Sequence, residues 1–313
     1  GNYGIAGEDY ESKRIYLKGF VIKELSRVAS NWRKERTLEE YLTDHDVPGI
    51  FGVDTRALVR HLRDRGAMRG VIGAATLGAE ALAARAKSGP EMNGQDLASQ
   101  VSTAEPYRWS EPPVDFGRKE PWPEAKRRVV VMDFGVKRNI LRSLVAMGCE
   151  VHVVPASHST QDILALEPDG VLLSNGPGDP EPVDYAIKTV QELLGKKPIF
   201  GICLGHQILS IAAGAKTYKL KFGHHGANHP VMELETKKVE MTSQNHGFAV
   251  DIESLPADVE MTHVNLNDQT CSGMRFTNKP AFSVQYHPEA APGPRDGRYL
   301  FERFVTLMDQ TRG

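Results

Sequence analysis

The sequence predicts an α/β protein of two domains, in which a smaller α/β N-terminal domain precedes a C-terminal domain with a mostly parallel sheet flanked by helices. A length of 313 residues suits two domains better than one. A proline-rich stretch separates two parts of different pattern. Behind it, short β-branched runs alternate with segments of helical periodicity, which favours right-handed strand–helix–strand units.

The proline-rich stretch covers residues 105–128 and carries five of the 19 prolines. Such a segment interrupts helices and supplies few backbone donors to a sheet. We therefore predict an N-terminal domain over 1–105, a linker over 106–127 and a C-terminal domain over 128–313.

The C-terminal domain opens with a β-branched run at 129–134, which is typical of a buried strand. Apolar residues at helical spacing follow over 137–147, and Gly148 stands where a helix is expected to stop. The alternation continues with strands over 150–154, 170–174 and 198–202 and helices over 184–194 and 208–213. Beyond Gly214 the pattern changes to short strands and turns, before a last helix over 299–308.

The N-terminal domain has weaker patterns. A short helix is expected over 37–44 and an alanine-rich helix over 79–87. Asp54 is a candidate N-cap for a third helix that ends near Gly66.

Composition excludes several classes of protein. A net charge of −2 gives no bulk attraction to nucleic acid or to an anionic membrane. Apolar runs are far shorter than the ~20 residues that span a bilayer, and no secretory leader opens the chain. Three cysteines cannot form a disulfide framework. These features favour a cytoplasmic location.

Cys203 lies in the heptapeptide Gly-Ile-Cys-Leu-Gly-His-Gln, between a predicted strand and a predicted helix. The Gly-x-Cys-x-Gly form is that of a nucleophile elbow with cysteine as the nucleophile. Side chains two residues either side of such a turn would collide with neighbouring backbone, and the helix after it offers its positive end to a thiolate. The alternative is a small buried cysteine in a glycine-rich turn. Cys149 and Cys271 lack such a setting, and we interpret both as structural.

A thiolate nucleophile needs an imidazole, and the imidazole needs a group that orients it. His287 and Glu289 stand two positions apart after an alternating strand, in the order His-Pro-Glu. Residues i and i+2 of an extended segment project to the same side, and Pro288 favours an extended His287. A lone His-Pro-Glu is a weak signal, but its pairing with the cysteine elbow strengthens it.

Other histidines receive different interpretations. Three histidines between 224 and 229 lack a nearby carboxylate or cysteine that would complete a ligand set, so we predict a loop and no metal site. His206 is expected to support the elbow. His246 lies in a polar segment that we expect to meet substrate.

The C-terminal domain resembles the class I, triad-type glutamine amidotransferases. A narrower resemblance, to the small-subunit family of carbamoyl-phosphate synthetase, rests on the segments 133–140, 174–180, 221–230 and 244–250. It extends into the N-terminal domain through Gly-Val-Asp-Thr-Arg-Ala-Leu at 52–58 and Arg-Asp-Arg-Gly-Ala-Met at 63–68. The resemblance therefore covers nearly the whole chain.

The resemblance implies a ligase-class glutamine amidotransferase whose catalytic residues are Cys203, His287 and Glu289. Cys203 would form a glutamyl thioester, His287 would move protons, and Glu289 would hold the ring. Backbone N–H groups of Gly176 and Leu204 would stabilise the oxyanion. The residues implied to bind L-glutamine are Gly176, Gly178, Leu204, Gln207, Asn245, Gly247 and Phe248. Taken alone, Asn175-Gly176 could also be a simple turn.

The resemblance also implies a partner, because the sequence has no Gly-x-x-x-x-Gly-Lys-Ser/Thr phosphate loop. A large synthetase subunit would bind ATP, Mg²⁺ and bicarbonate and receive ammonia through a tunnel, to supply arginine and pyrimidine synthesis. No cofactor is expected in this chain. The chain starts with Gly1 and would lack the opening segment of the usual subunit, including a serine that contacts glutamine. The alternatives are a glutaminase subunit for anthranilate or GMP synthesis and a non-catalytic interaction subunit.

Overall fold

The computed structural model of the chain describes residues 3–115 and 117–312. Residues 1–2, 116 and 313, which belong to the predicted N-terminal domain, linker and C-terminal domain, lie outside the described residues. The chain divides into two compact units, Gly1–Glu91 and Met92–Gly313. Within the described ranges, no helix is long and apolar enough to cross a membrane.

The boundary between the units comes earlier than the sequence predicted. Residues after Met92 contact the second unit, since the Gly94 N–H donates to Asp179 at 2.9 Å and the Thr103 N–H donates to Asp133 at 2.8 Å. The predicted linker also holds a strand that joins the large sheet. These contacts join residues far apart in the chain, so composition alone placed the boundary wrongly.

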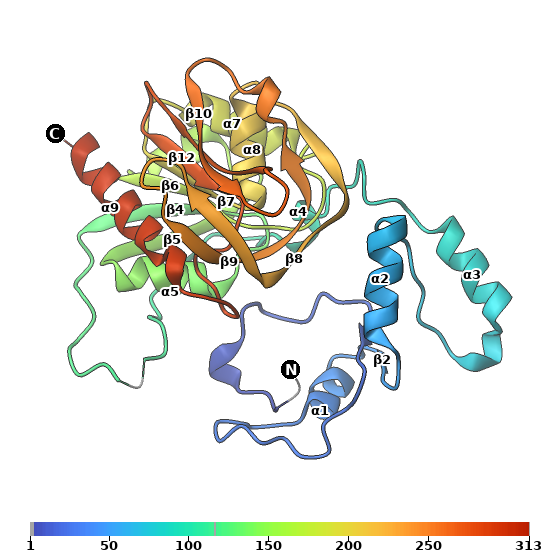
Figure 1. Cartoon of the computed structure of the whole chain (residues 1–313). Helices are drawn as coiled ribbons and strands as arrows, with labels where there is room; N and C mark the ends of the chain where they lie inside the picture. The colour runs from blue at the N-terminus through green and yellow to red at the C-terminus, as the bar shows by residue number, and fades with distance from the viewer. Residues whose placement is uncertain (1–2, 116, 313) are drawn as a thin grey trace. The chain divides into compact units, whose positions relative to one another are not determined.

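The first unit contains short helices and a two-stranded parallel sheet (Figure 1). The three predicted helices are present, and Asp54 caps the second of them by accepting from the Ala57 N–H at 2.9 Å. The elements are η1 (Gly7–Asp9), β1 (Phe20–Val21), α1 (Leu38–Asp44), β2 (Gly49–Ile50), α2 (Thr55–Arg65), η2 (Ala75–Leu77) and α3 (Ala79–Ser88).

The second unit is built on a ten-stranded sheet of order β3-β5-β4-β6-β7-β12-β11-β10-β8-β9. Its strands are β3 (Tyr107–Trp109), β4 (Arg127–Asp133), β5 (Cys149–Pro155), β6 (Gly170–Leu173), β7 (Ile199–Ile202), β8 (Thr217–Glu233), β9 (Val239–Val250), β10 (Val259–Asn265), β11 (Cys271–Phe276) and β12 (Ala281–Val284). Its helices are α4 (Ala98–Val101), α5 (Arg138–Ala146), α6 (Thr160–Ala165), α7 (Asp184–Leu193), α8 (Leu204–Ala212) and α9 (Tyr299–Thr311), with the 3-10 turns η3 (Ile252–Ser254) and η4 (Asp296–Arg298).

The strands from β5 to β12 in that order are parallel, and the remaining strands are added antiparallel. The α/β prediction is therefore confirmed, with its parallel part at the centre of the sheet. The short strands expected after Gly214 are instead the long hairpin β8–β9, which absorbs its glycines at register shifts after Lys219 and Gly226.

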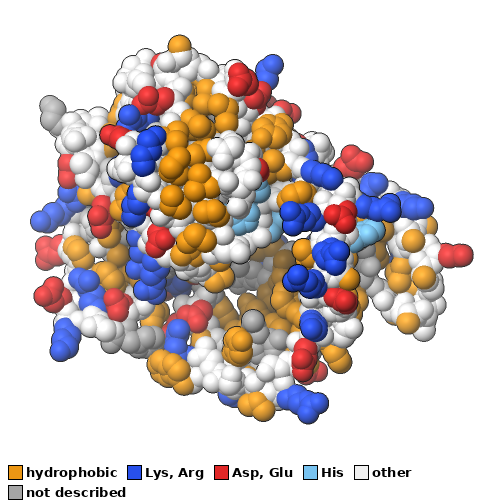
Figure 2. Space-filling view, viewed as in Figure 1, with side chains coloured by type: hydrophobic (Ala, Val, Ile, Leu, Met, Phe, Trp, Pro, Cys, Tyr) orange, Lys and Arg blue, Asp and Glu red, His pale blue; other side chains and the backbone are white. Residues whose placement is uncertain are grey.

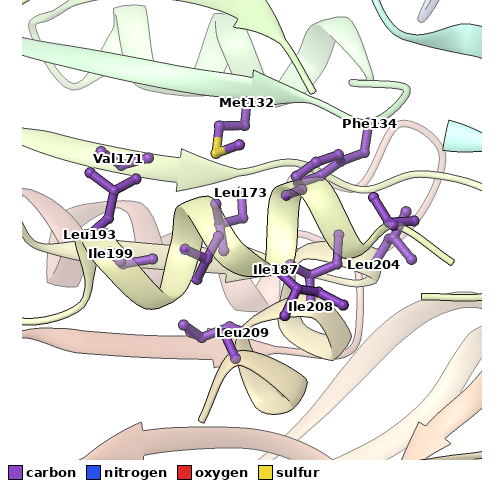
Figure 3. Packing of buried hydrophobic residues seen from close by; sticks show 14 of the residues in the cluster. Met132, Phe134, Val171, Leu173, Ile187, Leu193, Ile199, Leu204, Ile208 and Leu209 are labelled. Atoms are coloured by element: carbon purple, nitrogen blue, oxygen red, sulfur yellow. The ribbon is translucent and has the colours of Figure 1, made fainter. Parts of the chain in front are cut away.

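Apolar side chains cover both faces of the sheet. On one face, residues of β4, β6 and β7 pack against α7 and α8 (Figure 3). On the other face, α5 and α9 cover a second cluster that includes Phe200, Phe301 and Phe304. The two faces are typical of a three-layer α/β domain. Figure 2 shows hydrophobic side chains gathered on one outer face of this unit, with histidines beside them.

Candidate active site

Cys203 occupies the sharp turn between β7 and α8. Its φ of 53° and ψ of −103° are strained for a residue with a side chain, as expected of a nucleophile elbow. Its N–H donates to the Val284 carbonyl on β12 at 2.9 Å, so the sheet holds the turn in place. The predicted elbow geometry is confirmed.

The two glycines that flank Cys203 are required by close backbone approach. A Cβ on Gly201 would lie 2.7 Å from the carbonyl oxygen of Gly205. A Cβ on Gly205 would lie 2.2 Å from the carbonyl oxygen of Leu173 on β6. Neither oxygen belongs to a flexible side chain that could move aside, so both positions exclude a larger residue.

His287 and Glu289 lie in the turn that follows β12. Because β12 pairs in parallel with β7, with Val284 opposite Ile202, this turn reaches the edge of the sheet that carries Cys203. Within it His287 Nδ1 lies 2.8 Å from Glu289 Oε1, and both side chains are buried. Residues 288–289 form a turn rather than the expected extended segment, and the turn itself brings ring and carboxylate together.

The electrostatics of this group favour a charged pair next to the sulfur. Burial lowers the pKa of His287, but the Glu289 carboxylate, Cys203 and hydrogen bonds to both outweigh it and raise the pKa above its ordinary value. Burial raises the pKa of Glu289, but the charges of His287 and Lys137, with hydrogen bonds from both, lower it overall. With Nδ1 facing Glu289, the Nε2 atom is left for the hydrogen bond with Cys203.

Lys137 and Asn139 hold Glu289 from the opposite side, and the sequence analysis assigned neither of them a role. Lys137 Nζ lies 3.0 Å from Glu289 Oε1 and donates to the Ala290 carbonyl at 2.6 Å. Asn139 Nδ2 donates to the Glu289 carbonyl. Both residues belong to the segment 133–140 that carried the family resemblance. That resemblance was the one signal that could have found them, since 152 residues separate Lys137 from Glu289.

Gly176 packs against Leu204, the residue that follows Cys203. A Cβ on Gly176 would come 2.7 Å from Leu204 Cδ2 and 2.3 Å from the Phe134 carbonyl, so only glycine fits. Among the residues that the structure describes, neither the Gly176 N–H nor the Leu204 N–H has a hydrogen-bond acceptor. Two unpaired N–H groups on neighbouring residues beside a nucleophile have the composition of an oxyanion hole.

Gly178 lies on the same loop, where its φ of 95° requires glycine. The loop is braced by residues just after Met92. The Gly94 N–H donates to Asp179, and a Cβ on Gly178 would lie 3.1 Å from the Cβ of Leu97.

The remaining expected glutamine contacts come from α8 and β9. Gln207 is buried, and its Nε2 donates to the Phe248 carbonyl at 2.9 Å and to Gln285 Oε1 at 3.0 Å. Its amide thus ties the helix after Cys203 to the hairpin and to the segment before His287. Asn245 is exposed on β9, with its Oδ1 2.9 Å from His225 Nδ1, and Gly247 precedes the buried Phe248.

The histidines outside the cysteine site connect strands. The segment 221–230 is part of β8 and not the predicted loop. His206 Nδ1 lies 2.8 Å from Ser283 Oγ on β12, which confirms its support of the elbow. His246 was expected to meet substrate, but its ring is buried, with Nδ1 2.7 Å from the Phe248 carbonyl and Nε2 2.9 Å from Gln244 Oε1. Both ring nitrogens are therefore committed within β9.

Two family models match the chain. The model described as glutamine amidotransferase class-I matches residues 130–307, and the model described as carbamoyl-phosphate synthase small chain, CPSase domain, matches residues 1–72. A solved structure from Thermoplasma acidophilum, whose title describes part of a putative GMP synthase, has a TM-score of 0.53 and 22% identity over 59% of this chain and 96% of that one. This likeness shows the fold alone.

Curated relatives extend over both units. The carbamoyl phosphate synthase small chain of Syntrophotalea carbinolica is 55% identical over 100% of this chain and 84% of its own length. The proteins of that name from Aquifex aeolicus and Thermus thermophilus are each 50% identical, over 98% and 100% of this chain and 83% and 80% of their own lengths. The chain belongs to the carbamoyl phosphate synthase small chain family, and its second unit contains a class I glutamine amidotransferase domain.

Proposed function

We propose that this chain hydrolyses L-glutamine to glutamate and ammonia, with Cys203 as nucleophile, His287 as general acid and base, and Glu289 as the group that orients and charges the imidazole. The observation that carries the proposal is the buried contact of His287 with both Cys203 and Glu289 at a strained elbow. A nucleophile, a base and an orienting carboxylate in that order are the components of triad chemistry.

The first half of the reaction makes a thioester. The Cys203 sulfur attacks the side-chain carboxamide carbon, and the negative charge on its oxygen is met by the N–H groups of Gly176 and Leu204. His287 then delivers its Nε2 proton to the departing nitrogen, which leaves as ammonia. Each N–H contributes about 3 kcal/mol to lowering the barrier, because the donors are already oriented before charge develops.

The second half releases glutamate. With the imidazole now neutral, His287 accepts a proton from water as the water oxygen attacks the thioester carbon. The same two N–H groups stabilise the second oxyanion, the carbon–sulfur bond breaks, and the imidazolium and thiolate are restored. Glu289 stabilises the imidazolium in both halves, and Lys137 and Asn139 keep the carboxylate in position.

Glutamine would lie between the loop that carries Gly176 and Gly178 and the β9 segment that carries Asn245, Gly247 and Phe248. Glycines suit a site that holds an amino acid by backbone contacts, because the main chain can approach closely. Gln207 contributes by fixing the Phe248 backbone, since its amide is bonded to the Phe248 carbonyl.

The ammonia would be used by a large synthetase subunit that combines it with bicarbonate at the expense of ATP, with Mg²⁺ bound on that subunit. Support comes from the small-chain names of the relatives, which denote one part of an assembly. The three cysteines are free and buried, which fits a reducing compartment, and we place the enzyme in the cytoplasm.

Ammonia release by the wild type and by Cys203→Ser, with and without the large subunit, tests this function. We expect the serine variant to lose at least about 100-fold in glutaminase turnover, because the hydroxyl is a far weaker nucleophile than a thiolate. The variant should still bind the large subunit, which should then support synthesis from added ammonia. Equal turnover of wild type and variant in both conditions would instead indicate a chain that only assists its partner.

A further inference from the structure

Lys219 is a lysine of the β8–β9 hairpin with an unusual setting. It lies directly opposite Phe248 in the antiparallel pair, and its Nζ is 5.2 Å from the centre of the Phe248 ring. The ammonium lies 3.3 Å from the Gly247 carbonyl oxygen and 3.4 Å from that of Leu220. The side chain is therefore folded over the β9 backbone at Gly247–Phe248 rather than extended into solvent.

The ammonium lacks an anion. Among the residues that the structure describes, no carboxylate forms an ion pair with Lys219, and its two long hydrogen bonds go to carbonyl oxygens. Partial burial lowers the pKa of this amine, so keeping it charged costs free energy. Lys238 of the same hairpin, by contrast, lies 3.2 Å from Glu240. A half-buried cation without a counter-ion is a favourable place for an anionic ligand.

The ammonium is also close to the proposed reaction centre. A Cβ on Gly247 would lie 2.9 Å from Lys219 Nζ, so ammonium and Gly247 share the same surface. Phe248, the next residue, is bonded through its carbonyl to Gln207, one helical turn after Cys203. Glutamine presents its carboxamide to the cysteine and carries its only anion at the other end of the molecule.

We propose that Lys219 binds the α-carboxylate of glutamine, and thereby selects a free amino acid over a glutamine side chain within a peptide. The inference rests on the proposed glutaminase function. Lys219 contributes to substrate binding and takes no part in proton transfer, because Cys203, His287 and the two N–H groups complete the chemistry without it.

The test compares L-glutamine with its α-amide, which keeps the reactive carboxamide but lacks the negative charge. Ammonia release is measured for wild type, Lys219→Met and Lys219→Arg, in the presence of the large subunit. The control is Lys216→Met, an exposed lysine three residues away. Thermal unfolding of each variant checks that the hairpin is intact.

For glutamine, Lys219→Met should raise KM about 10- to 100-fold with kcat within about threefold of wild type, the range expected for a lost charged hydrogen bond. Lys219→Arg should recover part of this loss, and Lys216→Met should behave as wild type. For the α-amide, wild type and Lys219→Met should have the same kcat/KM, since the variant has nothing left to lose.

Two results would overturn the assignment. An unchanged KM for glutamine in Lys219→Met would show that the carboxylate binds elsewhere. An equal loss on glutamine and on the α-amide would show that Lys219 only supports the hairpin. Failure of the glutaminase function itself is separate, because the wild type would then release no ammonia from glutamine.

Discussion

The elbow around Cys203 and the hairpin β8–β9 form the two sides of the proposed glutamine site, and they differ in how much change they allow. At the elbow, main chain packs on main chain, so that a Cβ at Gly205 would overlap a carbonyl of a central strand. At the hairpin, a Cβ at Gly247 would meet only the end of the Lys219 side chain. The catalytic side is therefore fixed by the core of the sheet, whereas the binding side can adjust.

The largest effect should come from placing the same methyl group on each side. Gly205→Ala is expected to lower the free energy of unfolding by about 3 kcal/mol, because the Leu173 carbonyl belongs to β6 and cannot move without disturbing the sheet. Gly247→Ala should cost under about 1 kcal/mol, since a lysine side chain can shift. Denaturant unfolding of both variants measures the difference, and equal losses would contradict the contrast between the two sides.

Cysteine labelling should show the next largest effect. A glutamine-like electrophile is expected to alkylate Cys203 at least about 100-fold faster than Cys149 or Cys271. Burial raises the pKa of each of the latter two thiols to about 12, whereas Cys203 contacts His287. Peptide mapping of the labelled chain gives the rates, with Cys203→Ser as the control. Comparable labelling of all three cysteines would show that the elbow does not activate its thiol.

The smallest effect should come from Glu289→Gln, which keeps the shape of the side chain. We expect kcat to fall roughly 10- to 100-fold with KM nearly unchanged, because the imidazolium loses its carboxylate but glutamine keeps its contacts. Steady-state ammonia release measures both constants. A change in KM alone would assign Glu289 to binding.

The same substitution should alter stability in acid. The pKa of Glu289 is lowered in the folded chain from its ordinary 4.5, so its stabilising contribution is present above that value and is lost as the pH falls through the lower folded value. Glu289→Gln should lack this loss. A wild-type curve of unfolding free energy against pH that is parallel to that of the variant over this range would show that the carboxylate is not charged in the fold.

Predictability from the sequence followed the same division between local and distant contacts. The strand and helix on either side of Cys203 each carry their own periodicity, and the glycines of the elbow indicate its geometry. The pairing of β8 with β9 was not foreseen, because glycines and Pro230 usually indicate loops, and only the cross-strand partners show that register shifts accommodate them. His287 and Glu289 were found by their spacing, although the extended geometry assumed for them was wrong.

Contacts between distant segments were beyond the reach of pattern. Nothing near Lys137 indicates that its amine meets Glu289, and nothing near Lys219 indicates that it faces Gly247 and Phe248. The family resemblance drew attention to the segment that holds Lys137 but gave neither lysine a role. Composition could likewise not show that residues 92–105 belong to the second unit.

The brace formed by Gly94 and Leu97 has a practical consequence for dividing the chain. A fragment that begins at the proline-rich stretch would retain every proposed reactive group, yet it would lose the partner of Asp179 and the neighbour of Gly178. The loop that presents the Gly176 N–H would then be supported from one side only. A shortened amidotransferase intended for crystallography or inhibitor screening should therefore start at Met92, before the brace.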